Sequence, residues 1–268
     1  MEALLFMVAL VAYLVVSAVR LFDPTARPSW LPRTLDALLV SGLGAHIGAL
    51  GLLVWRTGEL PVHTAGASTA SVAAVVGVGA LVLRPRNQGE ILAGVHVALV
   101  AVLLGLSLLM PTPIHSPDEN LATLWLPVHA VSTFVGISAF GLAFGISLVY
   151  LVVRRRLKTK QLKGLGRLPA IETLDRLNTR CILAGFLALT IGIAAGGLWA
   201  VTKATPPSGL GPTVWATLVA WGWYAAAVLV RIVGGWRGRL AAQFSVIGFV
   251  GLVASLGGIL IVMQGWHG

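Results

Sequence analysis

The sequence predicts an all-α membrane protein, a polytopic bundle of eight transmembrane helices with both termini on the outer face. Three observations predict this fold class: 57% of the 268 residues are hydrophobic, only 10% are charged, and the mean hydropathy is +0.91. Soluble domains average about 25% charged residues. The composition therefore excludes a soluble globular protein, and the lipid bilayer is the first expected partner.

Eight segments of the chain lack Asp, Glu, Lys and Arg, and each is at least 17 residues long. A helix rises about 1.5 Å per residue and needs roughly 20 residues to cross a hydrocarbon core about 30 Å thick. No segment alternates apolar and polar residues with a period of two, as a transmembrane β-strand would. The predicted helices cover residues 3–19, 37–55, 60–83, 91–109, 121–153, 181–202, 204–230 and 240–268.

The first predicted helix, residues 3–19, differs from a secretory signal peptide. It follows Glu2 rather than a basic segment, and Arg20 and Asp23 come after it without an evident cleavage site. We therefore expect a retained helix. Within the later helices, small residues at four-residue spacing predict close helix packing. These pairs are Gly44 and Gly48, Gly141 and Gly145, and Gly192 and Gly196.

The basic residues predict the orientation of the bundle. Eight spans alternate in direction, and 17 of the 19 Lys and Arg residues then fall on one side of the membrane. The positive-inside rule makes this side cytoplasmic. The densest basic run, residues 154–167, suggests a nucleic-acid or regulatory partner, but charge that orients the chain at an anionic lipid surface explains it without one. We predict no nucleic-acid partner.

Few residues in the chain are of types that carry chemistry. Cys181 is the sole cysteine, which excludes a disulfide and a Cys-x-x-Cys motif, and we expect it to pack as a small apolar residue. Phosphate-binding glycine loops and zinc-protease spacings are absent. Asp118 and Glu119 could bind a cation, but their Pro-rich segment favours a solvated turn. The six histidines remain as candidates.

Distance along each helix from the cytoplasmic charges gives the expected depth of a histidine. His129 is 25 residues from Arg154, about 37 Å, and His267 is 28 residues from Arg239, about 42 Å. Both are expected at the outer edge of the bilayer, and His63 and His115 fall on outer connections.

His46 and His96 are expected inside the bilayer, His46 about 15 Å from Asp36 and His96 about 9 Å from Glu90. A polar side chain in hydrocarbon suggests a functional site, although a hydrogen bond to a backbone carbonyl would satisfy it equally well. A transporter that relays protons or metal through these histidines is one alternative, which no acidic pair supports.

Two imidazoles at one depth on two helices meet the requirement of bis-histidine haem ligation, which needs one ligand on each face of the macrocycle. His129 and His267 are therefore candidate ligands of haem iron. Trp125 and Trp266 could wall the macrocycle, although tryptophan also forms the ordinary interfacial belt. His46 is a weaker candidate for cofactor binding. Non-covalently bound, b-type haem is therefore one candidate cofactor.

Several segments resemble the cytochrome c assembly family, the group of CcsA, ResC and HemX. The resemblance implies a multi-pass protein of the bacterial inner membrane that holds haem at the outer face during cytochrome c maturation, with an assembly protein as partner. Its two outer ligand histidines correspond to His129 and His267. We expect one transmembrane domain over residues 1–268, with a four-helix half (1–110) and a half resembling the family (120–268). The matching segments are residues 125–129, 148–158, 168–178, 197–200, 235–239, 248–249 and 265–267.

Two departures from the family pattern concern catalysis. Haem lyases of the family carry Trp-Gly-x-x-Trp-x-Trp-Asp after the sixth span, whereas this chain reads Trp-Ala-Val-Thr from Trp199 onward. A transmembrane histidine of the family is replaced by Leu229. Ligation of the iron alone does not orient the reacting groups of the haem. The absence of the tryptophans that would orient them therefore argues against lyase activity.

The short eight-span form is more similar to the HemX branch, which implies an alternative function. The protein would then be a non-catalytic membrane regulator of haem biosynthesis at the level of glutamyl-tRNA reductase. Its partner would be a haem-biosynthesis enzyme, bound through the basic inner loop, residues 154–180. The sequence leaves both functions open.

Overall fold

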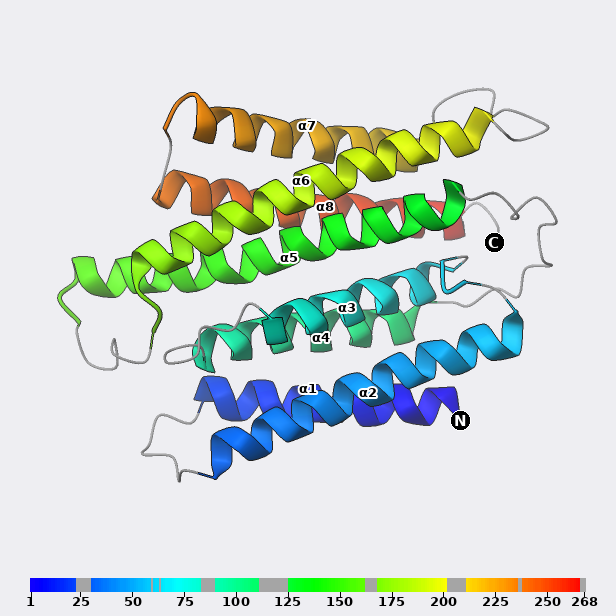
Figure 1. The fold of residues 1–268 in the computed structure, drawn as a ribbon, viewed down its shortest axis with the longest axis horizontal. Helices are drawn as coiled ribbons and strands as arrows, with labels where there is room; N and C mark the ends of the chain where they lie inside the picture. Colours follow the sequence, from blue (N-terminus) through cyan, green and yellow to red (C-terminus); the bar gives the residue numbers. More distant parts are fainter. Residues whose placement is uncertain are drawn as a thin grey trace. The chain divides into compact units, whose positions relative to one another are not determined.

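The computed structural model describes residues 1–22, 30–58, 60–62, 64–82, 90–110, 125–161, 168–201, 211–235 and 238–265, without the side chains of residues 213 and 256–265. These residues form eight α-helices and no β-strand (Figure 1), which confirms the predicted all-α class. The helices are α1 (Glu2–Phe22), α2 (Leu31–Thr57), α3 (Ala65–Val82), α4 (Glu90–Leu109), α5 (Trp125–Lys158), α6 (Ile171–Val201), α7 (Pro212–Ile232) and α8 (Arg239–Gly265).

The helices have the length and composition of membrane spans. Seven of them, α1 to α7, are long and apolar enough to cross a bilayer. Helix α8 has 27 residues, about 40 Å of helix, and its residues Arg239–Ser255 are apolar as well. The chain is therefore a polytopic helical membrane protein, as predicted. The placement of the termini on the outer face stays a prediction.

Two helices begin well before the uncharged segments that predicted them. Helix α2 begins at Leu31 rather than at residue 37, and α6 begins at Ile171 rather than at residue 181. Charged residues end a hydrocarbon-spanning segment, but they do not end a helix, because a helix satisfies its own backbone hydrogen bonds in water as well as in lipid. The acidic and basic side chains of these two stretches therefore lie on helices.

Helix α7 begins later than predicted, at Pro212 rather than at residue 204. Gly211 precedes it in extended conformation, and proline occupies the first turn. Proline suits that position because the first backbone N–H groups of a helix have no partner within the helix. This proline was the sequence signal for the start of α7.

The chain divides into two compact units. Unit 1 comprises residues 1–117 and 153–170, and unit 2 comprises residues 118–152 and 171–268. In unit 1, α1 packs against α2 and α4, and α3 packs against α4. In unit 2, α7 packs against α6 and α8. Consecutive helices within each unit run in opposite directions (Figure 1).

Unit 1 buries an ion cluster at the end of α1. The Arg20 side chain is fully buried, and its NH2 atom lies 2.5 Å from Oδ1 of Asp36 on α2. Its Nε atom lies 3.3 Å from Oε2 of Glu90 on α4. The two carboxylates keep about a third of their side-chain surface exposed. Arg20, predicted only as a charge at the membrane boundary, therefore joins three helices.

Glycines bring helices close together in both units, but in α2 the glycine that does so is not one of the predicted pair. In unit 1, a Cβ atom on Gly44 would meet nothing within 4 Å, and one on Gly48 would only touch Leu5 at 4.0 Å. Gly42 makes the close approach instead, since its Cβ would lie 2.9 Å from Ala12 Cβ on α1. The prediction that Gly44 and Gly48 pack closely against another helix was therefore wrong, because they do not lie on the packed face of α2.

In unit 2, Gly185 lies at a close contact between α6 and α5. A Cβ atom there would lie 2.6 Å from Cε1 of Phe140 and 3.1 Å from the Gly136 carbonyl oxygen. Phe140 is fully buried and stacks on Tyr224 of α7. The Phe140 ring is therefore confined between two helices, and α6 requires a glycine beside it.

Gly185→Ala is expected to lower the free energy of unfolding by about 1–3 kcal/mol, the usual cost of an extra methyl group in a packed core. Gly222→Ala on α7 is the matched control, because a Cβ atom at Gly222 would meet nothing within 4 Å. Thermal unfolding of both variants in the same detergent measures the difference. Equal melting temperatures would contradict the described contact between α5 and α6.

Candidate functional site

His129 lies in the first turns of α5, in unit 2. Helix α5 is continuous from Trp125 to Lys158, so the 25 residues between His129 and Arg154 correspond to about 37 Å along the helix axis. The imidazole and the basic tail therefore lie at opposite ends of α5, as the distance along the sequence predicted.

The His129 ring is held by the backbone of α6. Its Nδ1 atom lies 2.7 Å from the carbonyl oxygen of Gly192. A carbonyl oxygen only accepts hydrogen bonds, so in this contact Nδ1 carries the proton and donates it. In the neutral imidazole the lone pair then belongs to Nε2. Metal-binding histidines are commonly oriented in this way, with one ring nitrogen bonded to a carbonyl and the other coordinating the metal.

Two glycines of α6 make room for the imidazole. A Cβ atom on Gly196 would lie 2.7 Å from Nδ1 and 2.9 Å from Cε1 of His129. One on Gly192 would lie 2.6 Å from Oγ1 of Thr133, the residue one turn further along α5. Residues four apart share a helix face. The predicted packing role of the pair Gly192 and Gly196 is confirmed, and the surface that they contact includes His129.

Trp125 begins α5, one turn before His129, and is 37% exposed. Residues four apart on a helix are neighbours on its surface, so Trp125 lies on the same face of α5 as His129. The other two predicted residues of this site, Trp266 and His267, lie outside the described residues.

The last described residues of α8 belong to the same end of unit 2 as His129. The N-terminal end of α5 and the C-terminal end of α8 lie at one end of the unit (Figure 1). The two helices are in contact further along, where the rings of Phe144 and Phe249 lie 5.1 Å apart. Helix α8 is described as far as Gly265, two residues before His267.

His46 belongs to unit 1 and is fully buried. Its Nδ1 atom lies 3.3 Å from the hydroxyl of Tyr13, and the rings of Phe6 and Tyr13 approach it edge-on at 5.6 and 6.0 Å. Its Nε2 atom makes no hydrogen bond with a described residue. The Tyr13 hydroxyl is thus the hydrogen-bond partner of one of the two imidazole nitrogens.

Two other residues that the sequence drew attention to are also buried. His96 on α4 is 1% exposed and Cys181 on α6 is 4% exposed. The cysteine is a free thiol, and its burial confirms the expected packing as a small apolar residue.

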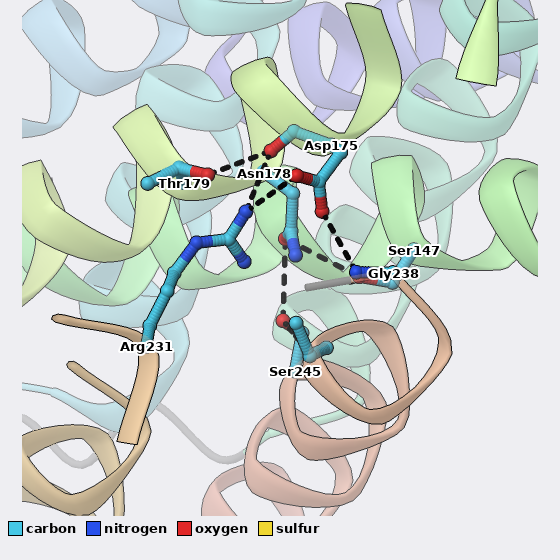
Figure 2. A network of polar contacts seen from close by, with 8 residues as sticks. Ser147, Asp175, Asn178, Thr179, Arg231, Gly238 and Ser245 are labelled. Carbon is cyan, nitrogen blue, oxygen red and sulfur yellow. Dashed lines mark hydrogen bonds and ion pairs between the residues drawn. The ribbon is translucent and has the colours of Figure 1, made fainter. Parts of the chain in front are cut away.

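A polar network joins all four helices of unit 2 at the end away from His129 (Figure 2). Asp175 of α6 is its centre. Its Oδ2 atom lies 2.9 Å from NH2 of Arg231 on α7, and its Oδ1 atom accepts a hydrogen bond from the Gly238 N–H at 3.2 Å. The Arg231 NH2 group also donates to the Asp175 carbonyl oxygen at 3.1 Å.

One helical turn further, Asn178 extends the network to α5 and α8. Its Oδ1 atom accepts hydrogen bonds from Ser147 of α5 at 3.3 Å and from Ser245 of α8 at 3.2 Å. Asp175 was not among the candidate residues predicted from the sequence, so this network was missed. The signal that could have found it was present, since the quoted segments 168–178 and 235–239 include Asp175, Asn178 and Gly238.

The fold and this geometry define a polytopic membrane protein that presents an oriented imidazole at one end of a helical unit, with a polar network at the other end. The chain matches the family model described as cytochrome C assembly protein over residues 43–267, and it belongs to this family. The match begins within α2. It therefore covers much of unit 1 as well, whereas the resemblance read from the sequence began at residue 120.

The chain is similar to proteins named cytochrome c biogenesis protein CcsA. It is 36% identical to that of Gloeobacter violaceus over 104 residues, 39% of this chain and 31% of that protein. It is 38% identical to that of Nostoc punctiforme over 101 residues, 38% of this chain and 29% of that protein. These matches cover about a third of the relatives' length. A Synechococcus sp. (strain CC9605) relative is 25% identical over 244 residues, 80% of this chain and 79% of that protein.

Proposed function

We propose that this protein handles haem in cytochrome c biogenesis and that His129 and His267 would hold the haem iron. The observation that carries the proposal is the hydrogen bond between His129 Nδ1 and the Gly192 carbonyl oxygen, because it leaves Nε2 for the metal. The family match and the names of the relatives support the choice of haem.

The donors of the described site fit haem. An imidazole is a usual axial ligand of haem iron, and the exposed indole of Trp125 one turn away offers a flat apolar surface for a macrocycle. Cys181 is the sole cysteine of the chain and is buried in α6, so the haem would be held non-covalently. Bound haem would supply the iron, and this chain would supply the oriented imidazole and the enclosing helices.

The site belongs to the outer face of a bacterial cytoplasmic membrane in this proposal. The 37 Å between His129 and the basic end of α5 supports that placement, since the positive-inside rule puts the basic end in the cytoplasm. The partner would be an assembly protein on the outer side. His46 of unit 1, whose Nε2 atom makes no hydrogen bond with a described residue, is a second candidate for cofactor binding, apart from the site in unit 2. No described contact favours the regulator alternative.

His129→Ala is expected to remove the low-spin absorption spectrum of the purified protein, because one of two axial ligands is lost. The protein would be expressed with ample haem, and bound haem would be measured by absorption spectroscopy. Imidazole added to the buffer should restore the spectrum if His129 acts as a ligand, whereas it would restore nothing if the ring only supports the fold.

His115→Ala is the control, because it removes a histidine that the sequence predicts on a connection between helices, and it should leave the spectrum unchanged. Wild-type protein that stays free of haem under these conditions would contradict the proposal. So would a low-spin spectrum in His129→Ala that is identical to the wild-type spectrum.

A further inference from the structure

An open cleft of about 440 Å³ lies between α6 and α7, at the end of unit 2 that carries the polar network. Its lining residues are of two chemical kinds. The apolar lining residues are Ile182, Leu183, Val228 and Ile232, and the polar lining residues are Asp175, Arg176, Thr179, Arg180 and Arg231. A ligand that fits it would therefore combine an apolar part with a charged group.

The polar lining residues carry an excess of positive charge. They include three guanidinium groups and one carboxylate, and the carboxylate of Asp175 is already paired with Arg231. Arg176 and Arg180 are exposed, and the one hydrogen bond described for Arg176 is to the Thr173 hydroxyl at 3.3 Å. The charged group that the cleft favours is therefore an anion.

Arg231 contributes a buried donor to this polar lining. Its side chain is only 10% exposed, its NH2 atom is bonded to Asp175, and its NH1 atom is buried without a hydrogen-bond partner among the described residues. Burying a donor without a partner is unfavourable. An anionic oxygen that enters the cleft would satisfy this donor and interact with the two exposed guanidinium groups.

We propose that the cleft binds the phosphate group of an anionic phospholipid. Guanidinium groups match phosphate oxygens in geometry and charge. The cleft lies where α6 and α7 meet the predicted cytoplasmic surface, and the leaflet at that surface carries the anionic lipids. The acyl chains would lie along the apolar lining residues, a contact that free phosphate cannot make. The bound lipid would thereby join α6 to α7 beside the Asp175–Arg231 pair.

The test compares lipid binding by the full chain in detergent micelles. Labelled phosphatidylglycerol is titrated into wild-type protein and into the double variant Arg176→Gln/Arg180→Gln. The expected result is binding about 10-fold to 30-fold weaker in the variant. The variant should unfold at the wild-type temperature in lipid-free detergent, because both side chains are exposed.

Two controls separate this site from general attraction between charges. Arg154→Gln/Arg155→Gln removes the same charge from the exposed end of α5 and should change the affinity less than twofold. Phosphatidylcholine and inorganic phosphate should each fail to displace the labelled lipid at the concentration where unlabelled phosphatidylglycerol displaces it. Equal weakening in both double variants, an unchanged affinity in the cleft variant, or displacement by inorganic phosphate alone would overturn the proposal.

Discussion

Gly196→Ala is expected to weaken haem binding by about 10-fold to 100-fold, while the neighbouring change Gly197→Ala leaves it unaltered. The added methyl group at position 196 would lie 2.7 Å from His129 Nδ1. The imidazole is the end of a side chain, so it would turn away and lose its hydrogen bond to Gly192. Loss of the group that orients a metal ligand usually costs 10-fold to 100-fold in affinity.

Gly197 is the matched control because a Cβ atom there would meet nothing within 4 Å. The two variants add the same methyl group to the same helix, so they differ only in what that group contacts. Haem titration followed by absorbance, with thermal unfolding in parallel, measures both affinity and stability. If both variants bind haem as tightly as the wild type, the ring of His129 does not contribute to the site.

Arg20→Gln is expected to lower the free energy of unfolding by about 3 kcal/mol. Breaking a buried ion pair usually costs 3–5 kcal/mol, because the remaining partner keeps an uncompensated charge. The lower end of this range applies here, since Asp36 and Glu90 are each about one-third exposed and water screens part of the loss. Denaturant unfolding of the protein in mixed micelles measures the change.

Arg56→Gln provides the comparison within unit 1. Arg56 of α2 pairs with Glu2 of α1 at 2.7 Å, but 68% of its side chain is exposed. Exposed pairs contribute at most about 1 kcal/mol, so this variant should be nearly as stable as the wild type. Comparable losses from the two variants would mean that the burial of Arg20 contributes nothing.

The sequence predicted the helices because the requirement to cross a bilayer is a property of each segment alone. It predicted their ends less well, because Asp36 and Asp175 lie on helices that extend beyond the hydrocarbon. The ionic contacts of Arg20 could not be predicted, since they depend on which helices of unit 1 become neighbours. Charge counting treated Arg20 and Asp36 as separate boundary markers, although the buried Arg20 side chain is paired with Asp36.

In the candidate site too, some features could be predicted from the sequence and others could not. The position of His129 at the end of α5 away from the basic residues followed from counting residues along one helix. The proton position on its ring did not, because it depends on a carbonyl oxygen 63 residues away. The glycine pair that permits this contact was visible in the sequence, but nothing in the spacing of Gly192 and Gly196 indicates which side chain they accommodate.

The ion cluster in unit 1 also has a consequence for the order in which the chain is assembled. Asp36 follows Arg20 by 16 residues, so the first counter-ion of Arg20 is synthesised with the very next helix. Glu90 arrives only at the start of α4, after α3 has also been made. The charge of Arg20 is therefore matched in two stages during biosynthesis, first within the hairpin of α1 and α2 and then by α4.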